Sequence, residues 1–147
     1  MNLDRYNYLT TDNYHNYTFY SEGAKGKIKK TVIYTKIFDD PIAYNLAFGD
    51  EDDKTGLIND AIVTDNKDRD VVLATVAATI IEFSKRFGNH YIYATGNTLS
   101  RTRLYQIGVG KFLDEISEEF EVFGYNNGHW HEFERNENYE ALLVKRK

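Results

Sequence analysis

The segment from about Arg69 to Phe87 constrains the fold most strongly, because its apolar residues recur at helical spacing. They lie three or four positions apart in one stripe: Val72, Val76, Ile80, Phe83 and Phe87. Leu73, Ala77 and Ile81 widen this stripe, and so broad an apolar face predicts a helix that lies across a sheet. Gly88 follows at once and is expected to end the helix.

The residues before this helix predict an antiparallel meander. Residues 27–38 form a long strand pattern, and residues 42–48 alternate cleanly between apolar and polar positions. Asp39-Asp40-Pro41 lies between them and is expected to turn the chain, since proline fixes φ and lacks an N–H donor. Shorter strands are expected at 18–21 and 60–64. Several side chains in Asp65–Asp68 could cap the helix that follows.

The second half of the chain continues this alternation of strands and helices. Tyr91–Thr95 is predicted to be a buried strand, and a helix begins near Leu99 with a weak point at Gly108-Val109-Gly110. Three further strands are expected at 119–125, 129–133 and 139–145. The chain therefore predicts an α+β fold with a mostly antiparallel mixed sheet and two helices, in the order β-β-β-β-α-β-α-β-β-β. A crossover through the first helix permits one parallel strand pair.

Residues 1–147 are expected to form a single domain, with residues 1–16 as an N-terminal arm and 17–147 as the core. No apolar run approaches the roughly 18 residues of a membrane span, and no secretory signal is visible. The chain has no cysteine, which excludes disulfides and thiolate chemistry. We expect a cytoplasmic protein that does not bind membranes. Its net charge of −5 makes nucleic acid an unlikely partner.

A polar ligand could be held where the strand ending at Thr95 gives way to the second helix. Asn97 can cap this helix, whose free N–H groups form an anion site. Arg101 and Arg103 add positive charge but point about 200° apart, so one could clamp a phosphate or carboxylate while the other pairs with an acidic segment. Together with Tyr93 and Thr95, these three residues form the predicted binding set. The alternative is a capped helix with surface arginines.

The element order and the run of Asn97, Arg101, Leu104 and Tyr105 resemble the GNAT acyltransferase superfamily over roughly residues 27–147. The resemblance implies acetyl-CoA as cofactor and Tyr105 as the general acid that protonates the departing coenzyme A thiolate. An enzyme of this kind would be an acyl-CoA-dependent N-acyltransferase. The motif's usual Gly-Phe ending is replaced by Gly108-Val109-Gly110-Lys111-Phe112, which is out of register.

The same resemblance implies a glycine-containing loop for the coenzyme A pyrophosphate near residues 65–73. This chain has Asp65-Asn66-Lys67-Asp68-Arg69-Asp70-Val71 there, without a glycine that would let the backbone approach a pyrophosphate. We therefore expect a domain whose pyrophosphate loop is degenerate and whose ligand is an acyl-CoA or another phosphate-bearing molecule. The chain also resembles a family of small bacterial proteins of unknown function that share Phe48-Gly49-Asp50 and Arg101–Tyr105 segments.

For the other charged and aromatic residues, a functional role competes with an ordinary structural one. Asp50 and Asp60 lie at predicted strand ends and are candidate general bases, or else turn formers. The acidic run Asp50–Asp53 is interpreted as a solvated loop, so we expect no metal site. His129-Trp130-His131 offers too few ligands for zinc and is interpreted as a hairpin edge. Five lysines are interpreted as edge-strand charges that limit aggregation: Lys25, Lys27, Lys29, Lys30 and Lys36.

A second hypothesis belongs to a different class of function from the acyltransferase hypothesis. The missing pyrophosphate glycines and the tyrosine- and tryptophan-rich strand edges would suit a non-catalytic interaction module. Such a module could belong to a bacterial toxin–antitoxin or defence pair, with a protein partner or a second copy of itself.

Overall fold

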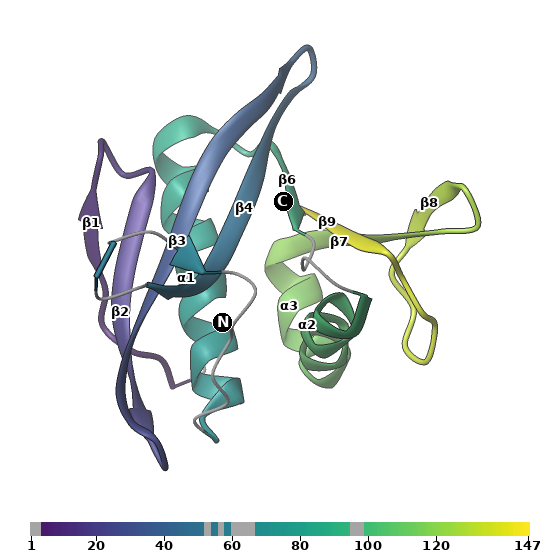
Figure 1. Ribbon diagram of the computed structural model, residues 1–147. Coiled ribbons are helices and arrows are strands. Elements are labelled where there is room, and N and C mark those ends of the chain that lie inside the picture. Colours follow the sequence, from purple (N-terminus) through teal and green to yellow (C-terminus); the bar gives the residue numbers. More distant parts are fainter. Residues whose placement is uncertain (1–3, 52–53, 56–57, 60–66, 95–98) are drawn as a thin grey trace.

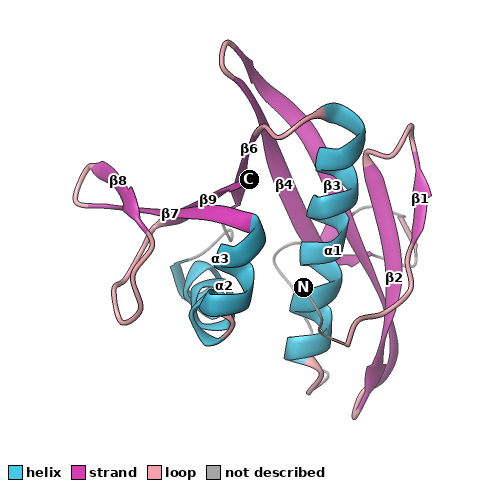
Figure 2. Ribbon diagram, turned by 180° about the vertical axis from the view of Figure 1, so that it is seen from behind, coloured by secondary structure: helices cyan, strands magenta, loops and turns pink. Residues whose placement is uncertain are grey.

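The computed structural model describes residues 4–147 except 52–53, 56–57, 60–66 and 95–98. Within these residues the chain forms a nine-stranded sheet and three helices. In chain order they are β1 (Leu9–Thr11), β2 (Asn16–Gly23), β3 (Gly26–Asp39), β4 (Ile42–Glu51), β5 (Ile58–Asn59), α1 (Arg69–Phe87), β6 (Tyr91–Ala94), α2 (Leu99–Lys111), α3 (Leu113–Glu119), β7 (Phe120–Asn126), β8 (His129–Glu132) and β9 (Ala141–Arg146). The three helices lie on the same face of the sheet (Figures 1 and 2).

The sheet is mixed but contains a single parallel pair among the described strands. The strand order is β1-β2-β3-β4-β6-β9-β7-β8, with β5 paired to β4. Neighbours run antiparallel except β4 and β6. These two are joined through α1, since parallel strands need a crossover connection. The predicted α+β fold with a mostly antiparallel mixed sheet is confirmed.

The expectation of two helices is wrong, because the second predicted helix is divided into α2 and α3. The division lies at Phe112, not at the predicted Gly108-Val109-Gly110, and Phe112 and Leu113 pack against a hydrophobic core there. Gly108 serves a different purpose inside α2. A Cβ at this position would lie 2.6 Å from Cδ2 of Leu73, so the glycine lets α2 approach α1. No helix in the described part of the chain is long and apolar enough to cross a membrane.

The element order also differs from the predicted one in the first half of the chain. Residues 9–11 of the predicted arm form β1, which pairs with β2. A short strand, β5, lies at Ile58–Asn59. The strand predicted at 60–64 falls outside the described residues. The long hairpin of β3 and β4 is present, with an irregular register between Lys36 and Phe38.

α1 packs across β2, β3, β4 and β6 over an aromatic core. Its buried members are Tyr17, Phe19, Val32, Tyr34, Tyr44, Leu46, Phe48, Phe83 and Ile92. The rings of Tyr34 and Phe83 stack with centroids 4.2 Å apart, and the hydroxyls of Tyr34 and Thr79 share a hydrogen bond of 2.8 Å. Burial raises the pKa of Tyr34 well above its ordinary value. The predicted apolar stripe of α1 and the predicted face of β4 both meet in this core.

A second, smaller core lies under β7 and β9. Its buried members are Ile116, Phe120, Val122, Phe133, Tyr139 and Leu142. Tyr105 and Val109 of α2 pack against its side, and Ile80 and Ile81 of α1 reach it from the first core. The helices therefore cover both halves of the sheet, while the β7–β8 hairpin extends beyond them (Figure 1).

Candidate functional site

β4 pairs first with β6 and then with β5 along the same edge. Residue pairing runs from Ala43 opposite Tyr91 to Leu46 opposite Ala94. β4 continues to Glu51 and pairs there with β5 instead. In open sheets with parallel strands, ligands are commonly held where strands part at their carboxyl ends. The predicted residues Thr95 and Asn97 belong to this place in the sequence but lie outside the described residues.

Tyr105 reaches this end of β4 from α2. Its half-buried ring lies 6.4 Å from the ring of Phe48, centroid to centroid, and contacts both hydrophobic cores. Asp50 follows Phe48 by two positions, so both side chains project from the same face of β4. The structure thus brings Tyr105 and Asp50, two of the predicted catalytic residues, to the same end of one strand. Asp60, the third, lies outside the described residues.

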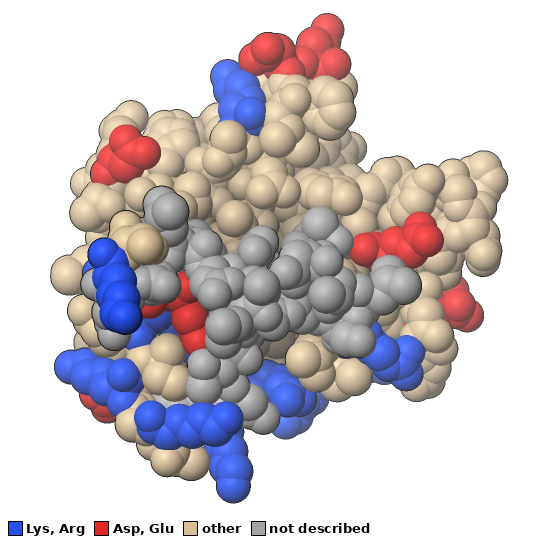
Figure 3. Space-filling model, in the orientation of Figure 1, with Lys and Arg blue, Asp and Glu red and all other residues tan. Residues whose placement is uncertain are grey.

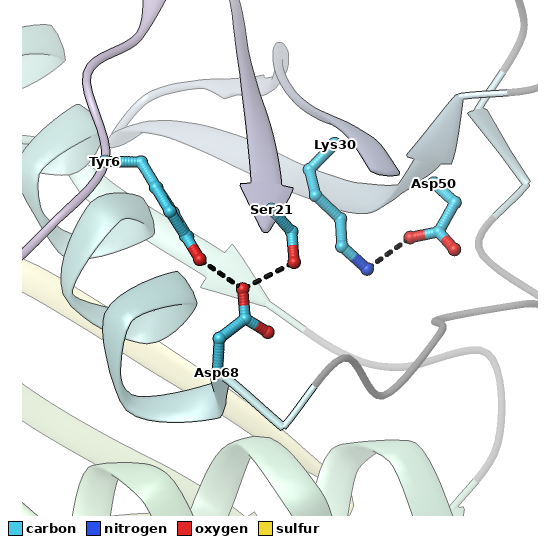
Figure 4. A network of polar contacts seen from close by, with 5 residues as sticks. All are labelled: Tyr6, Ser21, Lys30, Asp50 and Asp68. Carbon is cyan, nitrogen blue, oxygen red and sulfur yellow. Dashed lines mark hydrogen bonds and ion pairs between the residues drawn. The ribbon is translucent and has the colours of Figure 1, made fainter. Parts of the chain in front are cut away.

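Asp50 has a buried cationic partner, Lys30 of β3 (Figure 4). The Lys30 Nζ lies 2.5 Å from Oδ1 of Asp50, and the two residues are directly opposite in the β3–β4 register. The Lys30 side chain is 1% exposed and that of Asp50 is 13% exposed. The prediction of a solvated acidic loop is therefore wrong for Asp50 and Glu51, which belong to β4.

The sequence does not single out Lys30 as a site residue, because its charge is typical of an edge strand. β3 instead lies between β2 and β4, and the ends of the strand order are β1 and β8. A signal was present in the sequence. Lys30 has the same strand parity as Val32 and Tyr34, which are both buried.

A second polar cluster lies beside this pair at the start of α1 (Figure 4). The Oδ2 of Asp68 accepts a 2.6 Å hydrogen bond from the Tyr6 hydroxyl and a 2.5 Å bond from Ser21 Oγ. Burial, and then this bond to Asp68, raise the pKa of Tyr6. The expected side-chain cap is absent at Asp68, because its carboxylate is turned toward these two hydroxyls. Asp68 thereby ties the N-terminal segment and β2 to α1.

The surroundings of these clusters are rich in positive charge on the side seen in Figure 3. Lysine and arginine side chains gather there around the turn between β2 and β3, whereas acidic side chains mark the tip of the β3–β4 hairpin. The exposed Lys25 and Lys27 belong to the first group, and Asp39 and Asp40 to the second. The end of the sheet that holds Lys30 and Asp50 could therefore attract an anionic ligand.

The other predicted binding residues point in separate directions. Tyr93 lies on the opposite face of the sheet from Ile92, which is part of the first core. Its ring meets Trp130 edge-on, with centroids 6.2 Å apart. Arg103 is exposed and donates a hydrogen bond to Asn138 Oδ1, so it does not pair with the acidic segment. Arg101 belongs to α2, and its side chain lies outside the described part.

The hairpin edge at His129–His131 is present as predicted. Trp130 is 42% exposed, and the two imidazole rings lie 6.3 Å apart. Within the described residues no group of three or more His, Cys, Asp or Glu side chains could hold a metal ion.

Comparison with known proteins gives one match. The chain matches a family of unknown function, DUF6934, over residues 2–147. No curated protein and no solved structure matches it.

Proposed function

This chain belongs to the DUF6934 family, and we propose that it is a GNAT-like domain that binds an acyl-CoA or another phosphate-bearing ligand. The ligand would lie where β4 and β6 separate, and the bound acyl group would be passed to an amine. Tyr105 would act as the general acid toward the departing thiolate. Asp50, or Asp60 beyond the described residues, would accept the proton from the amine.

The observation that carries this proposal is the position of Tyr105 at the carboxyl end of the parallel pair. The described pairing of β4 with β6 reaches Leu46 and Ala94, and β4 pairs with β5 further on, at Asp50 and Glu51. Tyr105 packs there against Phe48, with Asp50 two residues further on. A proton donor and a carboxylate at a parting of parallel strands suit a reaction in which one proton is given and another is taken.

The succession of elements adds support in the second half of the chain. α1 leads into the central strand β6, and α2 follows with Leu104 and Tyr105 adjacent. This is the arrangement from which the resemblance to the GNAT superfamily arises. The cations near the β2–β3 turn would favour a ligand with phosphate groups.

The start of α1 differs from the glycine-containing pyrophosphate loop that the GNAT resemblance implies. The carboxylate of Asp68 lies at the start of α1 and is already held by Tyr6 and Ser21. A pyrophosphate at this helix start would meet a negative charge rather than glycine N–H groups. The ligand's phosphates are therefore expected to contact the neighbouring lysines instead.

A thermal-shift titration with acetyl-CoA, coenzyme A and ATP tests the binding. A ligand at about 100 times its Kd stabilises the fold by roughly 2.7 kcal/mol if it binds only the folded state. We expect stabilisation by both coenzymes and none by ATP. The absence of a shift with either coenzyme would contradict the proposal.

Tyr105→Phe separates binding from chemistry. Loss of the hydroxyl should lower acetyl transfer to a panel of amines by about 100-fold or more, while the coenzyme shift is retained. Tyr125→Phe is the matched control, because Tyr125 lies on the other side of the sheet beside Trp130. Equal transfer by the Tyr105 variant and the unchanged chain would remove Tyr105 from the reaction.

A second candidate function is a non-catalytic interaction module, as one half of a bacterial toxin–antitoxin or defence pair. Its support is an aromatic group on the sheet face without helices: Tyr93, Tyr125 and Trp130. Aromatic residues of this kind are enriched at protein interfaces. A partner protein or second copy bound there should be lost on Trp130→Ala and kept on Leu104→Ala, as measured by sedimentation velocity of the purified complex.

A further inference from the structure

A hollow of about 430 Å³ lies between the N-terminal segment and α1, and its lining residues differ from those of the site described above. Figure 2 shows the beginning of the chain beside this helix. Three α1 residues line its apolar side, Ala74, Ala78 and Ile81, which are four and three positions apart and so share a helix face. The two alanines leave space that larger side chains would fill. The volume is within the range of small-molecule sites in proteins.

The N-terminal wall of the hollow is fixed to α1 at two points. The Tyr6 N–H donates to Thr75 Oγ1 at 2.9 Å, and the Tyr8 hydroxyl donates to Glu82 Oε2 at 2.6 Å. Thr75 and Glu82 are about 10 Å apart along the helix. The hollow is therefore held open between two hydrogen bonds that cross from one segment to the other.

The lining carries three cations and a single carboxylate. The cations are Arg5, Lys85 and Arg86, and the carboxylate is Glu82. Glu82 is already engaged, because it accepts the Tyr8 hydrogen bond and lies 3.6 Å from Nη2 of Arg86. Burial, and then Glu82, raise the pKa of Tyr8 to about 12, so its hydroxyl stays protonated near neutral pH.

Two of these cations are available for a ligand. Arg5 and Lys85 take part in no ion pair within the residues that the structure describes. Arg5 is held in place by a hydrogen bond from Nη1 to the Tyr6 carbonyl oxygen, 3.0 Å long. Such an excess of positive charge is notable in a chain whose net charge is −5.

We propose that this hollow binds a small organic anion. Its carboxylate or phosphate group lies against Arg5 and Lys85, and its apolar body lies on Ala74 and Ala78. Charge complementarity selects an anion over a neutral molecule of the same shape. None of the residues that line the hollow belongs to the β4–β6 end of the sheet, where the acyl-CoA is proposed to bind.

Isothermal titration calorimetry of the full chain with phenyl phosphate, benzoate and neutral benzyl alcohol tests this proposal. We expect saturable binding of at least one of the two anions and binding of benzyl alcohol at least about tenfold weaker. Comparison of the two anions shows whether the site prefers phosphate or carboxylate. Failure of both anions to bind, or equal binding of benzyl alcohol, would overturn the proposal.

Two variants and a control test whether the anion binds in this hollow. Arg5→Gln and Lys85→Gln should each weaken the anion about tenfold, because each removes one charge-assisted contact. Lys36→Gln removes the same charge from the distant β3–β4 hairpin and should leave the affinity unchanged. An equal loss in the Lys36 variant would mean that the overall charge, not the hollow, attracts the anion, and the proposal would fail.

Ala78→Leu fills the hollow without changing any charge. It should abolish anion binding while the circular dichroism spectrum stays that of the unchanged protein. The same variant should keep the thermal shift with coenzyme A, which separates this site from the one under Proposed function. Undiminished anion binding in the folded Ala78→Leu protein would also overturn the proposal.

Discussion

Two ion pairs of the same chemistry stand side by side on β3 and β4 but on opposite faces of the sheet. Lys30 and Asp50 lie on the face covered by α1, with side chains 1% and 13% exposed. Lys29 and Glu51 lie on the face without helices, with side chains 35% and 18% exposed. Neighbouring residues of two strands thus offer the same lysine–carboxylate contact in two environments.

The comparison indicates that the burial of an ion pair, rather than the lysine–carboxylate contact itself, determines its contribution to stability. A charge buried without its partner is costly, so removing half of a buried pair strongly destabilises a protein. The Lys29–Glu51 pair, whose lysine is partly exposed, is screened more by water and is expected to contribute about 1 kcal/mol or less. The buried pair also lies beside Ser21, Tyr6 and Asp68, so its loss would disturb a neighbouring polar cluster (Figure 4).

The largest effect is expected from Lys30→Ala, which leaves the Asp50 carboxylate without its ammonium partner. The free energy of unfolding should fall by about 3–5 kcal/mol. Urea denaturation followed by circular dichroism measures this difference.

The double variant Lys30→Met/Asp50→Leu sharpens the result. Replacing both charges with apolar groups should recover most of the lost stability, since buried ion pairs are often no better than apolar neighbours. A double variant as unstable as Lys30→Ala would show that packing at these positions, rather than the broken ion pair, causes the loss.

A smaller effect is expected from Ser21→Ala in the adjoining cluster. Asp68 would lose one of its two hydroxyl donors but keep the bond from Tyr6. The unfolding free energy should fall by about 1–3 kcal/mol, as for a buried acceptor that loses a donor. Ser21→Thr, which keeps the hydroxyl, is the control, and a loss as large in that variant as in Ser21→Ala would point to packing instead.

Alkaline pH should lower the free energy of unfolding through the titration of Tyr8. The folded-state pKa of Tyr8 is about 12, above its ordinary value of 10.0, because of burial first and Glu82 second. Between about pH 10 and 12 the unfolded chain gives up this proton while the folded chain keeps it. Stability is therefore full below pH 10 and falls as the pH rises through this window.

Stability measured by urea denaturation from pH 9 to 11 checks this dependence. The fall should be shallower in Tyr8→Phe, which has no hydroxyl to titrate. Identical slopes for the variant and the unchanged protein would show that other groups cause the alkaline loss.

The smallest effect is expected from Lys29→Ala on the open face. The unfolding free energy should change by about 1 kcal/mol or less, and less still at high salt. If Lys29→Ala lowers the free energy of unfolding as much as Lys30→Ala does, burial does not explain the difference expected between the two pairs.

Much of the fold could be predicted because its signals are local. The alternation over Ile42–Phe48 and the stripe of α1 each specify their own face, and Gly88, at φ 103°, ends α1 as expected. The division of the second helix at Phe112 depends on the core beneath it, which no local pattern reveals. Lys30 is hard to predict for a related reason. Its strand parity places it among buried residues, but a lysine is typical of an exposed position.

The candidate site was less predictable than the fold. Tyr93 and Tyr105 lie close in sequence, but one belongs to a strand face turned away from the helices and the other to a helix packed on the opposite face. Short sequence separation says little about proximity when a strand and a helix intervene. The hydroxyl partners of Asp68 come from positions 62 and 47 residues away, a distance that no capping pattern encodes.

The parallel seam between β4 and β6 has a consequence for how the chain could be divided. The four residues of β6 join one part built around α1 to another built around α2 and α3. Asn89 lies on the surface just before this strand. Two fragments separated there would each carry most of one core, and β6 could rejoin β4 by strand addition.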